Sequence, residues 1–144
     1  MNVTSDFELL GVTIQVEGRP DMPVRLAPAA QRRGTGPPPT PLVLREGSEF
    51  RVRLEFAVGA GRDLEGLRFI DERTRQGVTV GHQEILLGDY RRGGPYEIVL
   101  PPERLPIGHM ARDVYQVIGT FVDKEGRVLG CESHSFEITK DWPH

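Results

Sequence analysis

The feature that most constrains the fold is a two-residue alternation of side chains between residues 50 and 58. The apolar positions are Phe50, Val52, Leu54, Phe56 and Val58. Charged side chains and one alanine fill the positions between them. Successive side chains of an extended strand point to opposite faces of a sheet. The pattern therefore predicts a strand with one buried face and one solvated face.

Shorter alternations of the same kind recur along the chain. They fall at residues 10–16, 67–69, 115–121 and 133–138. Turn segments that contain glycine separate them, at residues 59–61, 91–94 and 124–126. No helical periodicity of three turns is present. Several short strands joined by turn-rich segments predict an all-β fold, an antiparallel β-sandwich.

Residues 27–40 interrupt this pattern. The segment contains Pro28, two glycines and the run Pro37-Pro38-Pro39. Because proline fixes φ and lacks a backbone donor, a regular strand is not expected there. We predict a Pro/Gly-rich loop at 27–40 within a single domain of residues 1–144. A plain loop is favoured over a proline-rich ligand for an SH3-type domain.

Composition narrows the classes of partner. The chain has 144 residues and a net charge of −3, too mild to predict nucleic acid or an anionic membrane as partner. Cys131 is the only cysteine, so no internal disulfide can form. No apolar run is long enough to span a bilayer, and no signal peptide is visible. We therefore expect a cytoplasmic protein without stable membrane insertion.

Signals for catalysis are weak. The sequence contains neither Gly-x-Ser-x-Gly nor His-Glu-x-x-His, and its four histidines lack metal-ligand spacing. We predict no enzymatic activity, no catalytic residue, no metal and no cofactor. The acidic residues Asp71 and Glu72 are expected on a solvated face.

The apolar side chains suggest a binding function instead. Two packed sheets can separate slightly and admit a lipid chain between them. The candidates to line such a gap are Phe56, Leu67, Phe69, Ile85, Leu87, Tyr90, Met110, Val117, Phe121, Phe136 and Ile138. The same residues can equally form a filled core. Composition and periodicity do not distinguish a filled core from a pocket.

Seven short blocks follow one another in a characteristic order. They are LVLREG at 42–47, FRVRLEF at 50–56, RQGV at 75–78, LGDY at 87–90, PIGHMAR at 106–112, FVD at 121–123 and KDW at 140–142. Their order and spacing resemble the C-terminal domain of the Rho GDP-dissociation inhibitor family, over about residues 7–142. The resemblance implies an immunoglobulin-like β-sandwich.

The resemblance also implies a function. Proteins of that family bind prenylated Rho-type GTPases, hold the geranylgeranyl group between their sheets and keep the GTPase in solution. Exposing an isoprenoid to water costs roughly 0.8 kcal/mol per CH₂-sized unit, so such shielding is favourable. The implied partner is a prenylated Rho-family-like small GTPase with its geranylgeranyl group. His134 joins the candidate lipid-binding residues on this resemblance.

The chain departs from the family pattern in three places. Only residues 1–6 precede the first predicted strand, so we expect the family's N-terminal regulatory arm to be absent. The tryptophan positions of the family's last strand, counted back from Lys140, fall on Glu132 and His134. Polar groups facing a lipid are costly unless they are paired or solvated. The family's acidic run is reduced to residues 123–125, which weakens attraction for a polybasic GTPase tail.

The leading interpretation is an arm-less relative of the Rho GDP-dissociation inhibitors that binds prenylated small GTPases by their lipid. Two alternatives remain open. One is a general prenyl or lipid carrier of the delta-subunit type. The other is a protein-interaction sandwich with a closed core and no lipid site, which Glu132 and His134 favour.

Overall fold

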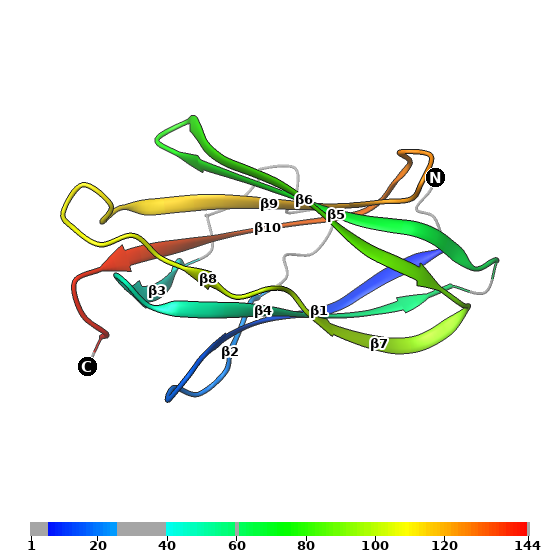
Figure 1. Cartoon of the computed structure of the whole chain (residues 1–144), viewed down its shortest axis with the longest axis horizontal. Helices are drawn as coiled ribbons and strands as arrows, with labels where there is room; N and C mark the ends of the chain where they lie inside the picture. Colours follow the sequence, from blue (N-terminus) through cyan, green and yellow to red (C-terminus); the bar gives the residue numbers. More distant parts are fainter. Residues whose placement is uncertain (1–5, 26–39, 60, 144) are drawn as a thin grey trace.

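The computed structural model describes residues 6–25, 40–59 and 61–143, which form two β-sheets packed face to face (Figure 1). The first sheet contains β1 (Phe7–Val16), β2 (Met22–Pro23), β4 (Glu49–Val58), β7 (Gly93–Val99) and β8 (Glu103–Arg104). The second contains β3 (Leu42–Arg45), β5 (Leu64–Arg75), β6 (Val78–Tyr90), β9 (Val114–Val122) and β10 (Val128–Thr139). The predicted all-β sandwich is confirmed. The predicted loop at 27–40 lies outside the described residues except for Thr40.

The order of strands decides which edges face solvent. In the first sheet, β4 lies between β1 on one side and β7 and β8 on the other. The second sheet has the order β3-β10-β9-β5-β6, so β6 is an edge strand. Pairings in the described ranges are antiparallel except that β3 runs parallel to β10, with Leu44 beside Ile138. The sandwich is therefore mixed at this one edge.

Strand β4 realises the alternation predicted at residues 50–58. Phe50, Leu54 and Phe56 are only 4%, 1% and 0% exposed, whereas Arg51 and Glu55 face solvent. Burying an apolar side chain of this size contributes roughly 1.5–3 kcal/mol relative to leaving it in water. The alternation in β4 thus determines the orientation of this central strand, whose apolar face packs toward the second sheet.

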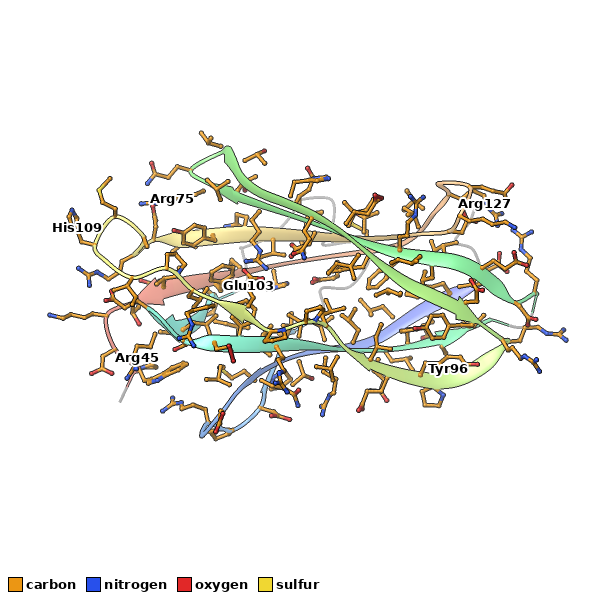
Figure 2. The ribbon with its side chains drawn as sticks, in the orientation of Figure 1. Arg45, Arg75, Tyr96, Glu103, His109 and Arg127 are labelled. Carbon is orange, nitrogen blue, oxygen red and sulfur yellow. The ribbon has the colours of Figure 1, made fainter. Side chains whose placement is uncertain are left out.

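Aromatic side chains fill the space between the sheets at one end. The ring of Phe121 lies 4.9 Å from those of Phe7 and Phe69, and Phe56 lies 5.0 Å from Tyr90. Tyr96, labelled in Figure 2, packs on Phe56 at the same end, with 5.8 Å between ring centroids. This end of the sandwich is therefore a packed aromatic core.

Gly119 of β9 leaves room for two inward-facing neighbours. A Cβ atom there would lie 2.6 Å from Phe69 Cε1 and 3.2 Å from Glu132 Oε1. We expect Gly119→Ala to lower the free energy of unfolding by about 1–3 kcal/mol, because the core has no space for the added methyl group. Urea unfolding followed by circular dichroism measures this change. Gly81→Ala is the control, since its Cβ would meet Arg73 Cβ at an ordinary 3.7 Å; equal losses in both variants would contradict the crowding argument.

Candidate functional site

A cavity of about 160 Å³ lies between the two sheets, beside the aromatic core. We call it the inner cavity. Its lining is mostly apolar and includes Val12, Ile14, Phe50 and Val52 from the first sheet and Ile85 and Phe136 from the second. Among its lining residues Gln83, Pro101 and Pro102 are exposed. They place its mouth between β6 and the segment that joins β7 to β8.

A second cavity of about 450 Å³ adjoins the first, and we call it the outer cavity. It includes the exposed residues Val80 and His82 of β6, so it lies at the surface. The residues that line both cavities are Asp71, Arg73, Gln83, Glu103 and Phe136. These shared residues lie between the smaller, mostly apolar cavity and the larger one at the surface.

The shared residues include a cluster of charged side chains. The guanidinium of Arg73 on β5 donates through both Nη atoms to the carboxylate of Glu103 on β8, with 2.8 Å between Nη2 and Oε1. Nη2 also donates to Asp71 Oδ2 at 3.0 Å. Its Cζ lies 5.7 Å from the ring centroid of Phe136 and 6.0 Å from that of Phe50. Arg73 therefore lies between the two sheets, and Glu103 on β8 is labelled in Figure 2.

The charges of this cluster compensate one another. Burial lowers the pKa of the Arg73 guanidinium, but the hydrogen bonds and charges of Glu103 and Asp71 outweigh this and hold the pKa above its ordinary value. Asp71 is 8% exposed, and its Oδ1 is buried without a hydrogen-bond partner in the described part of the chain. The expectation that Asp71 is solvated is wrong, because β5 turns it to the same inner face as Phe69. Glu72, one residue later, faces solvent as expected.

A second polar pair lies in the inner cavity. Glu132 and His134 on β10 both point inward, and His134 Nδ1 lies 3.0 and 3.2 Å from the two carboxylate oxygens. Their side chains are only 3% and 13% exposed. The distances suit a ring protonated at Nδ1, which donates to the carboxylate. Glu132 and His134 are therefore paired with each other, which lowers the cost of burying two polar groups in the interior.

The sequence as a whole matches one known family. The family model described as RHO protein GDP dissociation inhibitor aligns with residues 2–141. The chain belongs to the Rho GDP-dissociation inhibitor family. This agrees with the resemblance drawn from the seven blocks and with the two-sheet fold.

Curated Rho GDP-dissociation inhibitors from distant organisms are similar to the chain. The Rho GDP-dissociation inhibitor of Schizosaccharomyces pombe is 30% identical over 138 residues, covering 93% of this chain and 64% of the relative. Rho GDP-dissociation inhibitor 1 of Arabidopsis thaliana is 29% identical over 151 residues, covering 99% and 60%. The human Rho GDP-dissociation inhibitor 1 is 31% identical over 101 residues, covering 69% and 49%. The chain spans about half to two thirds of the length of these relatives.

Rho GDP-dissociation inhibitors are non-enzymatic regulators, which places this chain outside the enzymes as predicted. Within the described residues, no group of three or more His, Cys, Asp or Glu side chains is placed to hold a metal ion. The described part also contains no helix long and apolar enough to cross a bilayer.

In this Rho GDP-dissociation inhibitor fold, some of the predicted lipid-binding residues line the two cavities and the others do not. Phe69, Ile85, His134 and Phe136 line the inner cavity together with Val117, and Phe136 also lines the outer cavity with Ile138. The structure thus brings these residues together around two adjoining cavities.

The other candidates lie elsewhere. Those that belong to the packed core or pack against it are Phe56, Leu67, Leu87, Tyr90 and Phe121. Met110 is 73% exposed and lines neither cavity. It follows His109, which Figure 2 shows in the loop at the end of the molecule opposite Tyr96.

Sequence reasoning missed part of the lining. Val12 and Ile14 line the inner cavity. The alternation at residues 10–16 indicates that both point inward, so the sequence did contain a signal for them. Arg73 and Glu103 gave no such signal, because a charged residue in a strand normally indicates the solvated face. The two residues are 30 positions apart in sequence and lie on strands of different sheets.

Asp123, the first residue of the reduced acidic run at 123–125, is engaged within its own turn. Asp123 is 4% exposed and its Oδ1 accepts hydrogen bonds from the backbone nitrogens of Glu125 and Arg127, each at 2.9 Å. Its Oδ2 pairs with Arg127 Nε at 2.7 Å. Lys124 pairs with Glu65 at 2.7 Å. The carboxylate of Asp123 therefore shapes the β9–β10 turn and offers little charge to a partner.

Proposed function

We propose that this chain binds prenylated Rho-family small GTPases and holds their isoprenoid between its two sheets. The observation that supports this is the inner cavity, an apolar space lined by both sheets with its mouth at the edge of the sandwich. Hydrocarbon that leaves water for such a space gains about 0.8 kcal/mol per CH₂. Relatives named Rho GDP-dissociation inhibitors supply the class of partner, and carrying an isoprenoid through water is a cytoplasmic task.

The size of the inner cavity sets a condition on this function. An apolar protein cavity of about 150 Å³ is large enough for benzene, so the 160 Å³ space holds about one isoprenoid unit. A geranylgeranyl group is several such units long. To enclose it, the sheets must move apart or the chain must extend into the outer cavity.

One observation favours a second function. Glu132 and His134 occupy the inner cavity with a carboxylate and an imidazole, which are poor neighbours for hydrocarbon. A sandwich with such an interior could keep its core closed and bind a protein partner through its surface. A general carrier for several lipids is the third possibility.

Fluorescence titration of the protein with dansyl-geranylgeranyl cysteine methyl ester tests the proposal. We expect saturable binding, displaced by geranylgeranyl and farnesyl peptides more effectively than by an acyl peptide. Equal displacement by all three would indicate a general lipid carrier. A folded protein that shows no saturable binding would contradict the proposal and favour the closed core.

A further inference from the structure

The inner and outer cavities share lining residues, and the side chains of Arg73 and Glu103 lie where the two cavities meet. Arg73 and Glu103 line both cavities and bond to each other across them, one from β5 and the other from β8. An isoprenoid longer than the inner cavity must pass this pair if it is to use the outer cavity. The pair therefore lies where an isoprenoid longer than the inner cavity would have to pass.

The two halves of the pair differ in how firmly they are held. Arg73 lies on β5, which has hydrogen-bonded neighbours on both sides, β6 and β9. Glu103 lies on β8, a strand of two residues that pairs only with the start of β4, and its side chain is 38% exposed. Separation of the pair thus requires only that the Glu103 side chain turn toward solvent, while β8 keeps its backbone hydrogen bonds to β4.

Asp71 gives Arg73 a second acceptor. Its Oδ2 already accepts from Arg73 at 3.0 Å, while the neighbouring Oδ1 is buried and has no partner in the described part of the chain. A guanidinium released by Glu103 can donate to both oxygens of Asp71 in the fork geometry that arginine favours. The buried charge of Arg73 remains compensated whether the pair is closed or open.

We infer that the Arg73–Glu103 ion pair is a gate that determines how long an isoprenoid chain the interior accepts. This inference rests on the proposed function. With the gate closed, short chains occupy the inner cavity, and longer chains gain little from their additional units. With the gate open, the added units enter the outer cavity and each contributes to binding.

The test compares S-geranyl, S-farnesyl and S-geranylgeranyl cysteine methyl esters as competitors of the dansyl probe. We expect Glu103→Gln to bind the geranylgeranyl ester roughly tenfold more tightly than the unaltered protein does, because a charge-assisted hydrogen bond no longer holds the gate closed. Affinity for the geranyl ester is expected to change by a much smaller factor. Arg73→Lys removes the bidentate contact with Glu103 from the side of β5. We expect it, too, to raise the affinity for the geranylgeranyl ester relative to that for the geranyl ester.

Glu49→Gln is the matched control, because Glu49 is exposed, lies opposite β8 and contacts Arg104 at a distance of 3.8 Å. The gate would be overturned if Glu103→Gln raised the affinity for all three esters equally. It would also be overturned if Glu103→Gln and Glu49→Gln had the same ratio of geranylgeranyl to geranyl affinity. The proposed function would stand in both cases. If the unaltered protein bound none of the esters, the proposed function would fail and the gate with it.

Discussion

Ile85→Glu is expected to weaken isoprenoid binding roughly 100-fold, because it places an ionised carboxylate where the hydrocarbon would lie. Ile85 lines the inner cavity from the edge strand β6 and is only partly buried. In the free protein a glutamate at this edge can turn toward water, so the fold is expected to survive. With an isoprenoid in the cavity, the carboxylate would lose that hydration.

Leu86→Glu is the matched control for this experiment. Leu86 is the next residue of β6, points to the opposite face and is 68% exposed. It receives the same charge at nearly the same place, so electrostatic effects on the dansyl probe are shared. Thermal unfolding of both variants checks that the fold is retained. Similar affinities for the two variants would show that the isoprenoid does not occupy the inner cavity.

The second large effect concerns the pair on β10. His134→Leu is expected to lower the free energy of unfolding by about 3 kcal/mol, because it leaves the buried carboxylate of Glu132 without its partner. Glu132 is 3% exposed, so little solvent reaches its carboxylate to take the place of the imidazole. Ser133→Leu, on the exposed face of the same strand, is the control and is expected to change stability little.

Replacing both members of the pair is expected to restore most of this loss. Glu132→Leu with His134→Leu removes the buried charge along with its partner, and such replacements are often neutral or stabilising. Urea unfolding of the two single variants and the double variant forms a thermodynamic cycle that isolates the coupling. If the losses simply add, the pair is not a coupled unit. The double variant also presents a more apolar cavity, so we expect it to bind the dansyl probe more tightly.

The sequence predicted best those strands that have one face in the core and the other in solvent. Strand β4 alternates between a buried and a solvated face along its length, and the period of two is visible in the sequence. Strand β6 was not predicted from residues 78–90. It lies at an edge where both faces are partly exposed, so polar residues such as His82 and Glu84 interrupt any alternation.

The site was harder to predict than the fold for a different physical reason. Periodicity tells which side chains point inward, but the gap between two sheets depends on how all of them pack. Phe56 and Phe69 both belong to alternations and both are part of the hydrophobic core, yet only Phe69 borders the inner cavity. The contact of Arg73 with Glu103 depends on the stacking of two sheets, which no local pattern encodes.

The absence of a strand ladder across the cavity mouth has a consequence for the motion of the protein. Strand β6 pairs only with β5, and β7 and β8 pair only with β4, so in the described residues no pairing joins the two sheets at this edge. Widening the mouth breaks side-chain contacts and one ion pair, but no backbone hydrogen bond of either sheet. Loading of cargo should therefore leave amide hydrogen exchange in the strands slow throughout, while methyl resonances such as those of Ile85 and Val52 report each opening.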